Sequence, residues 1–268
     1  LEDDYASIFE ENNENNEEVI FDLQYIPNLR PQPWPSTSLS YSEWPTAGVT
    51  LSLIDDYYMI NGKPITDPNS GYDEQKARDP RMAATLVLPG SMFGTYVYIP
   101  ANLDVEVQTC FRPRKYADIN STDRYNCGIN IILMRYADVL LMAAELGSPN
   151  AQAYLNQVRQ RAYTVNDGKG NLSVSGDYRE VAVTKENIIK ERMLEFAFEG
   201  QRYWDLLRQG VDYAASQIAG TTSVVSGGNP DDVSITASNI TGKRGFSQIP
   251  NNQITLSNGV LKQNVGWY

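Results

Sequence analysis

The chain has 268 residues, 41% of them hydrophobic, so it can bury a sizeable core in one or two domains. Its net charge of −11 argues against nucleic acid and against an anionic membrane surface as partners. It contains no histidine, which excludes histidine-based catalytic triads and histidine-ligated metals within this sequence, and it has no apolar run of about 18 residues that could span a bilayer.

Residues 1–131 are expected to be mostly irregular, with short strands. Residues 1–20 form an acidic, polar lead-in that is helical in part, and Val19–Tyr25 has the composition of a strand. Prolines are frequent in Ile26–Thr46, where they fix φ and remove backbone donors, so neither helix nor strand is expected. Leu51–Ile60 is expected to form a short helix that ends before the turn dipeptide Asn61-Gly62.

A small amount of β-structure is expected after this helix. Pro64–Arg81 is rich in loop residues, and three charged side chains are expected to tie it down by hydrogen bonds: Arg78, Asp79 and Arg81. Ala84–Pro89 and Thr95–Pro100 are rich in β-branched and aromatic residues, and Pro89-Gly90 marks a turn between these two predicted strands.

Neither the two cysteines nor the acidic pair Asp55-Asp56 predicts a metal site. Cys110 and Cys127 bracket a polar loop, and a disulfide between them would add on the order of 3 kcal/mol. Two separate thiols are the alternative, because two cysteines also fit a chain that is not built around disulfides. No four-ligand zinc pattern exists, and Asp55-Asp56 is interpreted as a solvated helix position rather than a calcium site.

Residues 132–210 carry the clearest pattern and predict two helix pairs. Apolar residues recur at helical spacing over Ile132–Leu146, and Gly147 is a suitable C-terminal stop. Ser148-Pro149 offers an N-cap and a first helical residue, and the next helix keeps its apolar residues on one face over Ala151–Ala162. Because short connections favour antiparallel packing, we expect an αα-hairpin core.

A third helix is expected to begin at Thr184, its N-cap, with Glu186 in the first turn. Opposite charges follow at helical spacing: Glu186 and Lys190, Arg192 and Glu195, Glu199 and Arg202, Asp205 and Arg208. They lie among large apolar residues, so a partly buried ion-pair network is predicted rather than a solvated face. Such pairing keeps carboxylates ionised and disfavours a catalytic pair drawn from Glu191, Glu195, Glu199 and Asp205.

The C-terminal part of the chain is expected to be less regular. Val211–Ala219 fits a short amphipathic helix, and Gly220–Lys243 is dense in Ser, Thr, Gly and Asn, which favours a surface loop with at most a weak hairpin. In the tail from Arg244, Trp267 and Tyr268 are expected to pack against the body.

Seven motifs stand in a fixed order along the chain: ENNEEVIFDLQY (14–25), NGKPI (61–65), ARDPRM (77–82), RYADVLLMAAE (135–145), LNQVRQRA (155–162), IIKERMLEFAFEGQRYWDLLRQG (188–210) and RGFSQIPNNQITLSNGVLKQNVGWY (244–268). Together they resemble the C-terminal half of the RagB/SusD family of surface nutrient-binding lipoproteins. The resemblance implies a mainly α fold with irregular loops and a little β-structure, in which tetratricopeptide-like helix pairs pack with a loop-rich non-repeat region.

The resemblance also implies the domain organisation. Residues 1–268 would form a single SusD-like C-terminal region, with helix pairs over 132–210 and mostly irregular structure with short strands over 1–131 and 211–268. The family's N-terminal half, with its signal and lipidated cysteine, is expected to be absent from this sequence. Because repeat units stack on their neighbours, the helix pairs should then leave an apolar face uncovered.

The function implied by the resemblance is non-catalytic binding of an oligosaccharide or other nutrient at the outer surface of the outer membrane. The glycan would be delivered to a SusC-like TonB-dependent transporter, and no cofactor is expected. The alternative is a helical domain that docks a protein and has no sugar site of its own. A glycoside hydrolase is disfavoured, because nothing in the sequence indicates a pair of carboxyl groups across a cleft.

Aromatic residues in loops or at loop edges are the candidate sugar-binding residues, because a sugar ring stacks its apolar face on Trp or Tyr. They are Trp34, Tyr41, Trp44, Tyr57, Tyr58 and Tyr72. The assignment is to the region rather than to each residue, since any one of these rings could instead cap the core of an irregular domain.

Overall fold

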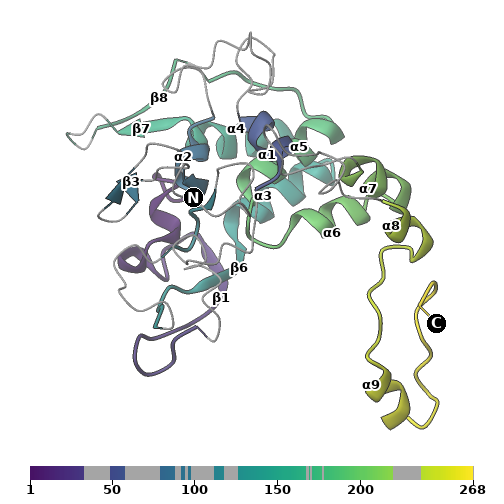
Figure 1. Ribbon diagram of the computed structural model, residues 1–268. Helices are drawn as coiled ribbons and strands as arrows, with labels where there is room; N and C mark the ends of the chain where they lie inside the picture. The colour runs from purple at the N-terminus through teal and green to yellow at the C-terminus, as the bar shows by residue number, and fades with distance from the viewer. Residues whose placement is uncertain are drawn as a thin grey trace.

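The computed structural model describes residues 1–32, 49–57, 79–87, 92–93, 96–97, 112–117, 126–166, 169, 171–176, 178–219 and 237–267. Its helices α3 to α7 lie together, with short two-stranded sheets around them (Figure 1). This arrangement confirms the predicted mainly α fold with a little β-structure.

The strand at the N-terminal end of the helical region was not predicted. Strand β1 (Val19–Leu23), which was expected, pairs antiparallel with β6 (Ile131–Arg135). The predicted helix start at Ile132 is therefore wrong: adjacent isoleucines favour extended backbone, because β-branched side chains lose rotamer freedom in a helix. Helix α3 begins only at Tyr136 and runs to Glu145, and the Tyr136 N–H donates to the Glu18 carbonyl oxygen across 2.8 Å.

Helices α3 and α4 form the predicted antiparallel pair. Gly147 ends the first helix in the left-handed region, with φ of 76°, as a C-terminal glycine can. Helix α4 (Ala151–Ala162) begins after Asn150 rather than at Pro149, and the Ser148 hydroxyl accepts from the Asn150 N–H at 3.2 Å. Their shared core is apolar and is completed from α5 and the residue after it: Ala137, Leu140, Leu141, Ala144, Ala151, Leu155, Val158, Ile188 and Phe196.

Helix α5 (Lys185–Glu195) begins where predicted, because the Thr184 hydroxyl accepts from the Asn187 N–H at 3.2 Å. The helix ends at Glu195, whereas the charge pairs predicted for this helix continue to Arg208. Phe198 and Gly200 adopt positive φ of 65° and 76°, and α6 (Arg202–Leu207) then starts in a new direction. The residues of the predicted single charged helix are thus divided between two helices.

The remaining β-structure pairs differently from the prediction. Helix α1 (Leu51–Tyr57) is present, but Arg81–Thr85 forms helix α2 and only Leu86–Val87 forms strand β2, which pairs with β5 (Arg112–Pro113). Tyr96–Val97, strand β4, pairs with β3 (Met92–Phe93). Each of the predicted strands Ala84–Pro89 and Thr95–Pro100 is therefore present only in part, and the predicted turn Pro89-Gly90 lies outside the described residues.

Short elements also occur between α4 and α5 and near the N-terminus. The segment between α4 and α5 contains an antiparallel pair of strands, β7 (Thr164–Asn166) and β8 (Leu172–Val174). Near the N-terminus, the 3-10 turns Ser7–Phe9 and Glu11–Asn13 confirm that the lead-in is helical in part, and Phe9 packs in a small core with Tyr116.

The C-terminal elements follow the helical block. Helix α7 (Val211–Ile218) is close to its predicted bounds, and α8 (Ser238–Gly242) lies in what was expected to be loop. Helix α9 (Asn251–Leu256) lies apart from the other helices (Figure 1). The expectation that Trp267 packs against the body is corrected: its indole N–H donates to the Phe246 carbonyl oxygen within the same C-terminal segment, at 2.8 Å. Tyr268 lies outside the described residues.

Helix α3 has an uncovered apolar face, as expected for a repeat-like unit without a neighbour. Tyr136, Met142 and Leu146 are exposed along it, and Leu146 is 87% exposed. Val139 and Ala143 are partly buried between them. The helical spacing of these five apolar residues places them on one side, while the opposite side packs against α4 and α5.

Candidate functional site

Most of the predicted sugar-binding aromatics lie outside the described residues: Trp34, Tyr41, Trp44, Tyr58 and Tyr72. Tyr57 lies in α1, is 1% exposed, and donates its hydroxyl hydrogen to the Leu194 carbonyl oxygen at 2.7 Å. A sugar can stack only on an accessible ring face, so the prediction for Tyr57 is corrected. It is a core residue that fixes α1 to α5.

Segment 58–78, which carries Tyr58 and Tyr72, begins and ends at neighbouring points of the core. The Asp79 N–H donates to the Tyr57 carbonyl oxygen across 3.4 Å, so the two ends of the segment are joined by a backbone hydrogen bond. Asp79 also accepts from Arg81, with its carboxylate 2.6 Å from Nη2, as the predicted Asp79–Arg81 contact requires. Arg78, the third member of the predicted cluster, lies outside the described residues.

Segment 33–48, which carries the other three aromatics, is also bounded by buried residues. Gln32 is buried; its N–H donates to the Cys127 carbonyl oxygen at 2.9 Å, and its amide donates to the Ile129 carbonyl oxygen. Val49, at the other end, is buried in a small core with Ile54. The residues that flank both segments are therefore held rigidly in the core.

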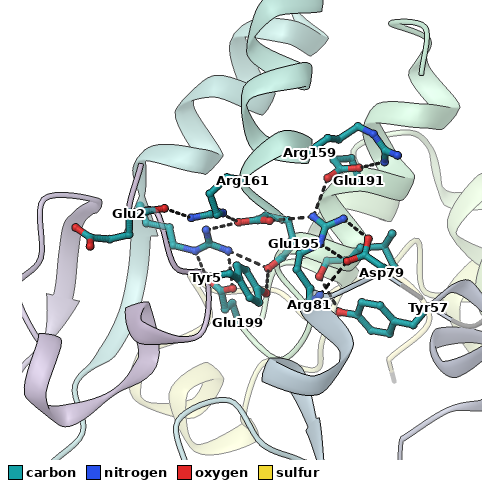
Figure 2. A network of polar contacts seen from close by, with 12 residues as sticks. Glu2, Tyr5, Tyr57, Asp79, Arg81, Arg159, Arg161, Glu191, Glu195 and Glu199 are labelled. Atoms are coloured by element: carbon teal, nitrogen blue, oxygen red, sulfur yellow. Dashed lines mark hydrogen bonds and ion pairs between the residues drawn. The ribbon is translucent and has the colours of Figure 1, made fainter. Parts of the chain in front are cut away.

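A buried network of charges centred on Glu195 provides this rigidity (Figure 2). The Glu195 carboxylate accepts from Arg135 Nη1 at 2.5 Å, from Arg81 Nη1 at 2.9 Å, and from Arg161 Nη2. Its backbone carbonyl oxygen accepts from the Tyr5 hydroxyl at 2.7 Å. One residue near the end of α5 thus joins the N-terminal segment, α2, the end of β6 and α4.

Two more carboxylates extend the network on either side. Glu18, in the N-terminal segment, bridges Arg135 at 2.7 Å and Arg161 at 2.8 Å. Glu191, one turn before Glu195, accepts from Arg159 Nη1 at 2.5 Å. Since the carboxylates and guanidinium groups supply partners for one another, the charges can be buried without a missing counter-charge.

Lys115 and Glu199 form the third part of the network. Lys115 Nζ lies 2.7 Å from Glu199 Oε1, and the same carboxylate accepts from Arg135 Nε at 2.8 Å. Burial lowers the pKa of Lys115 to about 8, although Glu199 opposes this shift. Burial alone would raise the pKa of the Glu199 carboxyl, but Arg135 and Lys115 hold it below its usual value.

Neither Glu195 nor Glu199 has the electrostatics of a general acid. Burial would raise the pKa of Glu195, yet the guanidinium groups of Arg161, Arg135 and Arg81 hold it well below the usual value, so the group stays ionised. A general acid needs a raised pKa. The expectation that these carboxylates serve the fold rather than catalysis agrees with this arrangement.

The partners of the network differ from those expected at helical spacing. Of the four predicted pairs, only Asp205 and Arg208 are joined among the described residues, at 3.0 Å. Arg192 instead contacts Asp138 and Asp205, at 2.6 and 2.8 Å. Sequence reasoning missed Glu18 as a member, because its partners come from distant parts of the chain and no local spacing indicates them. Arg135 gave a weak signal, as a charged residue within an otherwise apolar run.

Neither a metal centre nor a spanning helix occurs in the described part of the chain. No group of three or more His, Cys, Asp and Glu side chains there is placed to hold a metal ion. None of the helices described is long and apolar enough to cross a bilayer. Cys127 is buried and Cys110 lies outside the described residues, so their predicted alternatives stay open.

Comparison with known proteins identifies the family. The model of the SusD family matches residues 6–267. The chain belongs to the SusD family. One SusD-family relative, the SusD-like protein P25 of Formosa agariphila, is 30% identical over 240 residues, which are 77% of this chain and 42% of that protein. The chain therefore spans less than half the length of this relative.

Solved SusD-like structures share the fold. A SusD-like protein from Bacteroides fragilis has a TM-score of 0.67 at 24% identity, covering 98% of this chain and 57% of that one. Surface glycan-binding protein A from Bacteroides thetaiotaomicron, in complex with laminarihexaose, has a TM-score of 0.58 at 28% identity, covering 98% of this chain and 55% of that one. These similarities confirm the RagB/SusD resemblance and the predicted fold.

Proposed function

We propose that this chain is part of a non-catalytic, surface-exposed protein that binds an oligosaccharide. The observation that carries the proposal is the similarity, over 98% of the chain, to a surface glycan-binding protein that was solved with laminarihexaose. A second SusD-like neighbour, from Bacteroides fragilis and 27% identical, is described as a carbohydrate-binding protein.

Five loop aromatics are the binding residues in this proposal: Trp34, Tyr41, Trp44, Tyr58 and Tyr72. Two observations support the assignment. The rings offer the large apolar faces on which sugars stack. Both segments that carry them also start and end at residues fixed in the core, such as Gln32 and Tyr57. A fixed base lowers the entropy cost of ordering a loop around a ligand.

Binding without hydrolysis is also part of the proposal. Glycoside hydrolysis requires one carboxyl group that is protonated near neutral pH. Glu195 and Glu199 are held ionised by the basic groups around them, so neither can take this role. We expect bound oligosaccharide to be recovered unchanged after long incubation.

Delivery to a SusC-like TonB-dependent transporter, at the outer surface of the outer membrane, completes the proposal and rests on family membership. Copurification from outer membranes of the source bacterium tests it. We expect a TonB-dependent transporter to be the major protein recovered with the tagged chain, whereas its absence under mild detergent would count against this step.

A second function, docking of a helical protein segment, is favoured by the exposed apolar face of α3. Because the chain spans only 42% of the SusD-like protein P25, we propose that helices from the rest of such a protein cover Tyr136, Met142 and Leu146.

Calorimetric titration with a panel of oligosaccharides tests the main function. The panel contains laminarihexaose, maltohexaose, mannohexaose and an acidic oligogalacturonate. We expect saturable binding of at least one neutral member and no shorter sugars by chromatography afterwards. Failure of the folded protein to bind any member would favour docking as the function of this chain.

A further inference from the structure

A small cavity lies between α1, α4 and α5, beside the base of segment 58–78. Its volume is about 290 Å³. Tyr57 and Asp79, the residues on either side of that segment, both line it, together with Tyr163, Asn187 and Leu194. Segment 58–78, which carries two of the proposed sugar-binding residues, is therefore flanked on both sides by residues of the cavity wall.

The cavity offers both an aromatic ring and an unused hydrogen-bond acceptor. Tyr163 is half-buried and packs edge-on against Tyr178, with ring centroids 5.9 Å apart. The Asn187 amide nitrogen donates to the Ala182 carbonyl oxygen at 2.9 Å, and no described residue donates to its Oδ1. Asn187 Oδ1 can therefore accept a hydrogen bond from a hydroxyl group of a small ligand.

The charges of the cavity wall are paired with one another. Arg159 Nη1 lies 2.5 Å from Glu191, and Lys190 Nζ lies 2.9 Å from Asp56 Oδ1. Asp79 is paired with the Arg81 guanidinium behind it. An anionic ligand would have to displace a carboxylate from its cation, which costs more than the binding of an uncharged ligand. The wall therefore favours a neutral molecule with many hydroxyl groups.

We propose that this cavity is a subsite for one neutral pyranose residue of the bound oligosaccharide. The inference rests on the proposed function and names a part of its site. A pyranose ring presents an apolar face, suited to Tyr163, and hydroxyl groups at its edge, suited to Asn187 Oδ1. The volume lies near the lower limit of known ligand pockets, so it suits a single ring rather than a chain of them.

Binding by cavity variants tests the subsite, using the oligosaccharide of the panel that wild type binds most tightly. We expect Tyr163→Ala and Asn187→Ala to raise Kd about fivefold to tenfold, because each removes one contact with the ring. The control is Trp204→Ala, which removes an exposed aromatic ring from α6 and should leave Kd within about twofold of wild type.

A second measurement requires no variant and therefore does not depend on the folding of one. In the wild-type complex, intermolecular nuclear Overhauser effects should connect sugar protons with the methyl groups of Val181 and Leu194, which line the cavity. Binding by wild type with unchanged Kd in both cavity variants, or without these methyl contacts, would overturn the subsite and leave the proposed function intact. No binding of any oligosaccharide by wild type would overturn both.

Discussion

Arg81 Nη1 and Glu195 Oε2 form an ion pair of 2.9 Å although 114 residues separate them in the sequence. Arg81 begins α2, just after segment 58–78 rejoins the core at Asp79, and Glu195 ends α5. Neither side chain is exposed to solvent. The pair therefore ties the base of a proposed binding loop to the helical core, and its loss leaves a buried charge that water cannot solvate.

Replacing Glu195 with glutamine should lower the free energy of unfolding by about 3 kcal/mol, because three buried guanidinium groups lose their common counter-charge. Urea unfolding followed by circular dichroism measures the change. Glu186→Gln, on the exposed side of the same helix, is the matched control and should change stability by no more than about 0.5 kcal/mol. Equal, small losses in both variants would contradict a structural role for the network.

Acidification should destabilise the protein through the same carboxylates. On folding, the basic neighbours of Glu195 and Glu199 lower the pKa of each group below 4.5, although burial opposes this. A lowered folded pKa adds stability above the unfolded pKa, and this stability is lost as the pH falls through the folded pKa. We expect the free energy of unfolding to fall below about pH 4.5, and to fall less steeply in Glu195→Gln. Parallel curves for wild type and variant would contradict this.

Deprotonation of Lys115 should increase the stability of the protein at alkaline pH. Burial lowers its pKa from 10.5 to about 8, so its charge opposes folding below about pH 8, and this cost disappears as the pH rises toward 10.5. Relative to Lys115→Met, wild type should gain on the order of 2 kcal/mol between about pH 7 and pH 10. The exposed Lys185→Met is the control. A difference between wild type and Lys115→Met that does not vary with pH would rule out this titration.

Local patterns in the sequence predict the helical part of the fold well. Gly147 and Thr184 end and begin helices where expected, because each acts through its own backbone conformation or a hydrogen bond within one turn. The start of α3 was misplaced because strand pairing with β1, more than 100 residues away, decides the conformation of Ile132. Local spacing contains no information about such a partner.

The same reasoning explains the errors at the candidate site. Tyr57 follows acidic residues in a short helix, which is equally typical of a loop edge and of an amphipathic helix with one buried ring. Tyr57 is the buried ring because its hydroxyl donates to the Leu194 carbonyl oxygen, and only folding brings these two groups together. Similarly, charged residues among apolar ones predicted that a buried ion-pair network exists. The partners of Glu195 could not be predicted, because tertiary packing brings them together.

Tyr57→Phe separates the corrected role of this residue from the predicted one. Loss of the hydrogen bond to the Leu194 carbonyl oxygen should lower the free energy of unfolding by about 1 kcal/mol, because a buried acceptor is left unsatisfied. Oligosaccharide affinity should stay within about twofold of wild type, since the ring still fills the core. A much larger loss of affinity at unchanged stability would restore Tyr57 as a binding residue.

The central claim, sugar binding by loop aromatics, is tested most directly by tryptophan fluorescence during oligosaccharide titration. The chain has four tryptophans, and Trp204 is an exposed control on α6, outside the proposed loops. We expect a saturable shift in wild type and in Trp204→Ala, and its loss with at least tenfold weaker binding, about 1.4 kcal/mol, in Trp34→Ala or Trp44→Ala. The same shift and affinity in all four proteins would contradict the claim.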